Sequence, residues 1–227
     1  MKLLIEKNVN INININESPF IIKLFKKFAA IINNINDRKK RLLREIINLC
    51  FDKIIDVNII DPSNGCTLLM IIYIFFNRDI IYFNQYFDKI IDNGADLNIQ
   101  DNNGYTILMW LVESNDIPIS KKLLLNPNID INLKNNEGDT ALDIALKEKN
   151  RDFINLLLND NRLNKTSKSL NNAILTENIN IVKLLINKKF PINSWKKYIS
   201  KKEFNKEYKN KIIKLLYDKT KKNKKTK

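Results

Sequence analysis

The chain of 227 residues contains no histidine, and glycine, proline and cysteine are all scarce. Histidine is the base of Ser-His-Asp and Cys-His arrangements and supplies both ligands of the HExxH metal site, so its absence excludes these centres. The 4 glycines stand apart from one another, which excludes a glycine-rich phosphate-binding loop. The sequence therefore predicts no metal and no cofactor.

Two pairs of carboxylates remain as candidates for acid–base chemistry. Asp139 and Asp143 are four residues apart, but the first lies near a predicted turn and the second in a predicted helix. Glu203 and Glu207 lie on a lysine-rich helix, where ion pairing explains them better. We therefore predict that the chain is not an enzyme.

The few cysteines and the short apolar runs set the expected compartment. Cys50 and Cys66 form no CxxC motif, which favours a reducing interior. The longest apolar run, 66–76, is about half of the roughly 20 residues that a membrane span needs. The N-terminal apolar run is too short for a signal peptide. We expect a cytoplasmic or nuclear monomer with no membrane span that is not secreted through a standard signal.

The positive charge is concentrated at the C-terminal end. Sixteen lysines but only three acids lie from Lys188 onward, which places about +13 of the formal net charge of +14 there. Asn, Ile and Lys dominate the composition, as an A/T-rich genome would produce. Residues 219–227 are predicted to be disordered. Their lysines form either a solvated tail, an arm for nucleic acid or nuclear targeting, or an attachment to anionic membrane: Lys219, Lys221, Lys222, Lys224, Lys225 and Lys227.

Three stretches of similar sequence recur at near-constant spacing. They are 61–69, 101–108 and 135–142, and each contains a glycine followed within two residues by threonine. Gly104 and Gly138 are about 34 residues apart, and Gly65 precedes Gly104 by about 39, which is typical of a solenoid of repeats. The glycines suit turns that need positive φ, and the threonines can cap the helices that follow.

These stretches resemble the ankyrin repeat, most specifically over 56–160. That family's unit is a β-turn finger, a first helix opening with Thr-Pro-Leu-His, a second helix, and a Gly-Ala-Asp-x-Asn exit, which 90–98 reproduces. The resemblance implies an all-α solenoid of five to six units. Because the histidine of the motif is replaced, its hydrogen bonds between neighbouring turns are lost, apart from any that Asp143 supplies. We therefore predict an array held more by apolar burial, with fingers poorly protected from hydrogen exchange. The replacing residues are Ile21, Met70, Met109 and Asp143.

The match to the repeat weakens toward both ends. Residues 1–55 are expected to form irregular N-terminal repeats or a cap, with Ser18 and Pro19 as a degenerate helix opening. Residues 56–160 contain the well-matched repeats. Because 141–158 aligns without gaps to 169–186, a shortened repeat follows that has lost its finger. We expect 161–218 to hold this degenerate repeat and capping helices, before the tail at 219–227.

In the ankyrin family the fingers and the exposed side of the first helices form a concave groove that meets partners. By position, the resemblance points to Ser63, Asn64, Cys66, Asn102, Asn103, Tyr105, Glu113, Ser114, Asn136, Glu137, Asp139, Lys147 and Glu148. Tyr105 either anchors a partner or lies on a neighbouring finger. Ile74 and Phe75 either pack against about five extra residues near 77–81, the reading we favour, or form an exposed apolar patch.

The sequence as a whole predicts a non-enzymatic scaffold that binds a partner protein through this groove. By analogy, the A/T bias and degenerate repeats indicate a large DNA virus, an intracellular bacterium or a protist, with a host protein as the partner. The alternative is a nucleic-acid- or nucleus-associated adaptor that uses the basic tail.

Overall fold

The computed structural model describes residues 14–15, 18–19, 21–23, 26–27, 45, 48, 56–76, 80–193 and 195–225. Expectations for Cys50, for Lys227 and for most of the first 55 residues lie outside this part of the chain. The chain divides into two compact units, Met1–Ile107 and Leu108–Lys227.

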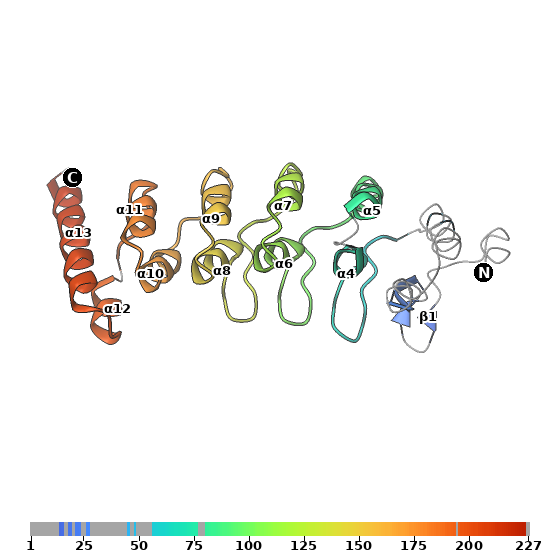
Figure 1. Ribbon diagram of the computed structural model, residues 1–227, viewed down its shortest axis with the longest axis horizontal. Helices are drawn as coiled ribbons and strands as arrows, with labels where there is room; N and C mark the ends of the chain where they lie inside the picture. Colours follow the sequence, from blue (N-terminus) through green and yellow to red (C-terminus); the bar gives the residue numbers. More distant parts are fainter. Residues whose placement is uncertain are drawn as a thin grey trace. The chain divides into compact units, whose positions relative to one another are not determined.

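The described part of the N-terminal unit includes two short strands and a pair of helices (Figure 1), and residues 21–23 and 26–27 are also helical. The strands β1 (Asn14–Ile15) and β2 (Ser18–Pro19) are antiparallel, with Asn14 opposite Pro19 and Ile15 opposite Ser18. Ser18 and Pro19 thus lie in a hairpin and not at a helix start, and the helical residues there are 21–23. The helices α4 (Leu68–Phe76) and α5 (Ile80–Asp92) pack against each other.

The C-terminal unit is built from four helix pairs. They are α6 (Ile107–Glu113, whose first residue closes the N-terminal unit) with α7 (Ile117–Leu124), α8 (Ala141–Lys147) with α9 (Arg151–Leu158), α10 (Ser167–Leu175) with α11 (Ile179–Asn187), and α12 (Trp195–Lys201) with α13 (Lys206–Lys225). First helices pack on first helices, α8 on α10 and α10 on α12. Second helices pack on second helices, α7 on α9 and α11 on α13. Each pair therefore buries the apolar face of the pair before it.

The core follows from the helical spacing of apolar residues. Phe153, Ile154 and Leu157 of α9 are fully buried. Their counterparts one repeat later, on α11, are also buried: Ile181, Val182 and Leu185. Burying each such side chain stabilises the fold by roughly 1.5–3 kcal/mol relative to exposure. The shared pattern explains why 141–158 and 169–186 align without gaps. No helix in the described part of the chain is long and apolar enough to cross a membrane.

The last helix is longer than the sequence indicated. Disorder was predicted from Lys219, but α13 continues through Lys225. Its first half is anchored by the buried side chains of Tyr208, Ile212 and Leu216. Once that anchor exists, lysine propagates a helix well, so the lysine-rich end extends the helix.

Candidate partner-binding surface

Equivalent backbone hydrogen bonds close the three fingers, although the first finger is one residue longer than the other two. In the second finger, the Asp101 amide donates to the carbonyl of Tyr105 at 2.9 Å and the Gly104 amide donates back to Asp101 at 2.8 Å. Gly104 has φ of 77°, which only glycine adopts at little cost. Corresponding bonds of 2.7–2.9 Å close the other two fingers between Asp61, Gly65 and Cys66 and between Asn135, Gly138 and Asp139.

A side-chain oxygen at the start of each finger holds its tip from inside. Oδ1 of Asp101 accepts the amides of Asn103 at 2.9 Å and Tyr105 at 2.8 Å. Asn135 accepts two amides in the same way, at 3.1 and 2.9 Å. Asp61 accepts the Ser63 amide at 3.1 Å. The sequence motif contained these residues, but their role in fixing the tip was not predicted.

Successive fingers in the N-terminal unit are in direct contact. The Asn102 amide donates to the carbonyl of Asn64 at 2.9 Å. A Cβ added at Gly65 would lie 2.5 Å from Oδ1 of Asn102 and 2.7 Å from its backbone nitrogen. Glycine is therefore needed here for close approach as well as for its φ of 74°.

Asp61 is buried at the base of the first finger and paired with a lysine distant in sequence. Lys26 forms an ion pair with its carboxylate, and the hydroxyl of Ser63 donates to it at 2.8 Å. Burial alone would raise the pKa of Asp61, but the bonds from Lys26 and Ser63 outweigh it, so the pKa lies below its ordinary value. No sequence signal connects Lys26 to this finger.

Asp139 lies at the end of the third finger, where the first two fingers have Cys66 and Tyr105, and it is buried, so it is not a surface contact. Its side chain is only 1% exposed and forms ion pairs with Lys147 and, at 2.7 Å, with Lys168. Burial would raise the pKa of Asp139, but the two lysines hold it below its ordinary value. Lys147 also reaches Oε2 of Glu137 at 3.2 Å. Asp139 was predicted to contact a partner, but its burial leaves it beneath the surface. There it orients Lys147 through the ion pair.

Lys168 covers the finger edge where the next finger is missing. In the described residues between α9 and α10 no hydrogen-bonded finger forms, and Thr166 caps α10 through the Ser169 amide at 3.1 Å. Nζ of Lys168 donates to the carbonyls of Gly138 at 2.6 Å and Glu137 at 3.2 Å. The flexible side chain of Lys168 thus donates hydrogen bonds to two carbonyl oxygens of the third finger, on the side where no further finger follows.

Polar side chains replace the pinning that histidine provides in the repeat motif. Asp143 accepts the amide and hydroxyl of Thr140 at 3.1 and 3.0 Å, and its other oxygen accepts Nδ2 of Asn172 at 3.2 Å, which joins α8 to α10. The exit segments are also bridged, because Asn132 donates to Arg162 at 2.9 Å and accepts the Asn164 amide at 2.7 Å. Asp143, the exception that the sequence allowed, therefore makes polar contacts between repeats, and Asn132 adds others between the exit segments.

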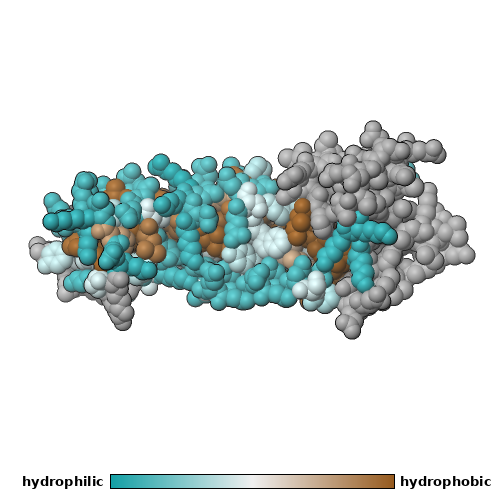
Figure 2. All heavy atoms as spheres, turned by 60° about the horizontal axis from the view of Figure 1, so that its bottom comes forward, coloured by the Kyte–Doolittle hydropathy of each residue, from teal (hydrophilic) through white to brown (hydrophobic). Residues whose placement is uncertain are grey.

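Most of the predicted contact residues lie at the surface. Those classed as exposed are Ser63, Asn64, Asn102, Asn103, Glu113, Ser114, Asn136, Glu137, Lys147 and Glu148. Figure 2 shows polar side chains over most of the described surface on the side toward which the fingers point, with apolar surface in separate patches.

Besides Asp139, two of the predicted contacts differ from this pattern. Tyr105 is half-buried. Cys66 is buried, and burial raises the pKa of its thiol to about 11, so it is not a contact. Ile74, for which we favoured burial, is 42% exposed, and the side chain of Phe75 lies outside the described residues.

Comparison with known families and structures accounts for the fingers and helix pairs. Residues 80–169 match the family model for ankyrin repeats in three copies. These residues form ankyrin repeats. The helix pairs form the all-α ankyrin solenoid, which is generally a protein–protein interaction module and typically not an enzyme. Within the described residues, no cluster of three or more metal-ligating side chains occurs.

Similar ankyrin sequences occur in a bacterium and a virus. An ankyrin repeat protein of Rickettsia felis is 31% identical over 134 residues, which cover 56% of this chain and 55% of that protein. One of Acanthamoeba polyphaga mimivirus is 26% identical over 166 residues, which cover 69% of this chain and 21% of that protein. The chain thus spans about half and about a fifth of the lengths of these relatives.

Solved ankyrin structures share the fold. The ankyrin repeat domain of Bcl-3, a member of the IkappaB family, superposes with a TM-score of 0.56 at 17% identity, over 79% of this chain and 75% of that one. The ankyrin repeat protein EF0377 superposes with a TM-score of 0.54 at 25% identity, over 75% of this chain and 83% of that one.

Proposed function

We propose that this ankyrin-repeat chain binds a partner protein through its finger tips and the exposed side of its first helices, the groove that the family uses. The observation that carries the proposal is the contrast between the fixed backbone of each finger and the exposed side chains at its tip. A rigid backbone that presents exposed side chains lowers the entropic cost of binding. The partner is a protein, and a host protein remains our proposal for its source.

The chemistry of the tips favours a polar partner surface. Asn102, Asn103 and Asn136 present amide groups that both donate and accept hydrogen bonds. Lys147 and Glu137 add a charge of each sign beside them. Tyr105 supplies the one aromatic ring among the proposed contacts, and it can anchor the interface with its exposed portion.

Site-specific photo-crosslinking in cells of the source organism or its host tests the proposal. A photoreactive amino acid is placed at Asn103 or Asn136, and at Lys121, an exposed position on the second helix α7, as the matched control. We expect the same protein adduct from both finger positions and none from position 121. Adducts that form only at position 121 contradict the proposal.

A second candidate function uses the basic end of α13. Lysine accounts for 9 of the 20 residues of this helix, so a nucleic-acid- or nucleus-associated adaptor is the alternative. Binding through phosphate contacts weakens steeply with salt. The test is retention of the protein on immobilised single-stranded DNA at increasing salt. Retention that is unchanged from low to moderate salt argues against this nucleic-acid function. Under either candidate function, we also propose that the protein is a monomer and is located in the cytoplasm or the nucleus.

A further inference from the structure

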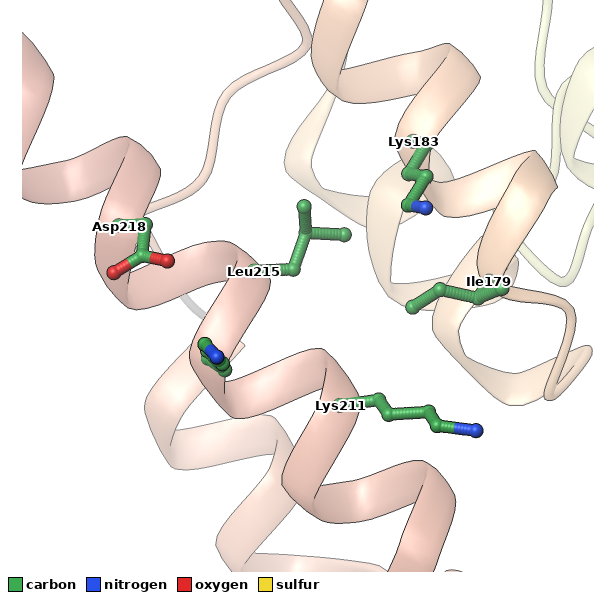
Figure 3. Close-up of a pocket in the computed structure, with 6 residues that line it drawn as sticks. Ile179, Lys183, Lys211, Leu215 and Asp218 are labelled. Atoms are coloured by element: carbon green, nitrogen blue, oxygen red, sulfur yellow. The ribbon is translucent and has the colours of Figure 1, made fainter.

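A groove between the second helices α11 and α13 is separate from the finger surface. It has a volume of about 460 Å³ and is open to solvent between the two helices (Figure 3). We call it the α11–α13 groove, and it is lined by Ile179, Lys183, Lys211, Lys214, Leu215 and Asp218.

Packing of the last repeat creates this groove. Tyr208, Ile212 and Leu216 hold α13 in place, and the Tyr208 hydroxyl donates to the carbonyl of Ile174 at 2.8 Å. Leu215 lies beside this buried stripe and is only half-buried. Its side chain points into the space between the helices, toward α11, which contributes Ile179 (Figure 3). The groove therefore has an apolar floor that the chain's own packing leaves partly uncovered.

The rim of the groove is positively charged. Lys183 and Lys214 are exposed, and neither has an ion-pair partner in the described part of the chain. Lys211 pairs with Glu207 at 2.5 Å, one turn before it on α13. Asp218 is the single acid of the lining, so positive charge exceeds negative charge there.

A smaller hollow of about 280 Å³ adjoins the groove on the other side of α11. Lys183 lines both hollows, and Arg151 adds a second cation. Four exposed asparagines line it, and the side-chain oxygen of Asn178 already caps α11. The other three supply amide groups that can pair with a peptide backbone: Asn155, Asn180 and Asn187. The second helices α9, α11 and α13 thus carry an apolar floor, cations and amides close together.

We propose that the α11–α13 groove binds an acidic protein segment with an apolar side chain. The apolar side chain covers Leu215 and Ile179, and flanking carboxylates face Lys183 and Lys214. Charge complementarity selects this partner, because the rim offers unpaired cations around an apolar contact. No aromatic ring lines the groove to stack on nucleic-acid bases, and an acyl chain needs a more enclosed apolar pocket.

Fluorescence anisotropy with a labelled synthetic peptide of repeated Glu-Glu-Leu triplets tests this site. We expect saturable binding to the full chain that weakens as salt is raised. Lys183→Glu combined with Lys214→Glu should lower the affinity about tenfold or more, because both exposed contacts become repulsive. Lys202→Glu combined with Lys206→Glu makes the same change of charge outside the groove and should alter the affinity about twofold at most. All of these positions are exposed, so the variants should fold.

Two further comparisons separate the apolar contact from the charges. A Glu-Glu-Ser peptide should bind at least about tenfold more weakly, since it lacks the apolar side chain. Asn136→Ala on a finger should leave peptide binding unchanged, so failure of the proposed finger function does not affect this test. Equal binding of the two peptides, or no saturable binding of either, overturns the proposal. So does preferential binding of single-stranded DNA or anionic vesicles through the same two lysines.

Discussion

At the scale of single residues, several positions keep a conformation that their side chains disfavour. Asn115, Lys149, Glu177 and Lys189 have φ between 54° and 65°, in the left-handed region. Lys189 follows α11 where Gly94 follows α5, and both end a second helix. A non-glycine residue costs roughly 1–2 kcal/mol in this region. The turn after α11 thus has the same left-handed conformation as the turn after α5, but with lysine in place of glycine.

Replacing Lys189 by glycine should therefore stabilise the protein. Relief of the left-handed cost, less the greater freedom of glycine in the unfolded chain, predicts a gain of about 0.5–1 kcal/mol in the free energy of unfolding. Gly94→Ala is the matched reverse change. It has free space around the added Cβ and should cost about 1 kcal/mol through φ alone. Urea titration measures both, and a destabilising Lys189→Gly would contradict the argument.

Asp139 should make stability depend on pH in the acid range. Its pKa in the folded protein lies below its ordinary value, so its contribution is complete above about pH 4 and is lost as pH falls through the lowered pKa. Asp139→Asn should cost about 2 kcal/mol at pH 7 and flatten the dependence of stability on pH below 4. Thermal melts between pH 7 and pH 2 measure this. Parallel curves for the two proteins would show that the ion pairs contribute nothing.

At the scale of elements, the fingers depend on what lies beside them. Gly65 and Gly138 both have φ of 74°, but a Cβ at Gly65 meets the backbone of the next finger, whereas at Gly138 its nearest neighbour is the flexible end of Lys168 at 3.4 Å. We expect Gly138→Ala to cost about 1 kcal/mol and Gly65→Ala about 1–3 kcal/mol more, because two fingers must separate. Equal losses in denaturant titrations would show that the fingers do not pack tightly.

Hydrogen exchange should also show ordered fingers. The amides of Tyr105 and Asp139 donate to side-chain oxygens within their own fingers at 2.8 and 2.9 Å. The absence of histidine predicted poor protection, but these bonds predict protection well above that of exposed amides. The exposed amide of Glu203, between α12 and α13, provides the comparison. Exchange of the finger amides as fast as that of Glu203 would support the expectation from sequence.

Features with a local cause could be predicted from the sequence. Gly138 and Thr140 reveal a finger and a helix start because backbone conformation and capping depend on a few neighbouring residues. The roles of Lys26 and Lys168 could not be predicted, because each side chain reaches a finger about 30 residues away. The sequence position of Asp139 predicted an exposed finger-tip residue. Its burial is explained by its ion pairs with Lys147 and Lys168, which only the structure reveals.

At the scale of the whole molecule, the basic end and the folded core are separable. The buried anchors of α13 end at Leu216, whereas the lysine-rich end begins at Lys219. Deleting 219–227 should change the melting temperature little and lower the far-ultraviolet helical signal. A melting temperature that falls by several degrees would show that the end packs on the core. Unchanged helical signal would restore the prediction of disorder.

The missing finger between α9 and α10 has a consequence for engineering. The repeats on either side of it keep their helices, so recognition loops and scaffold are independent parts of this chain. A loop copied from 135–140 and inserted before Thr166 should give the C-terminal unit a second finger tip beside the first. Lys168 now occupies the carbonyls that such a loop would need, so the graft requires its replacement by a short side chain.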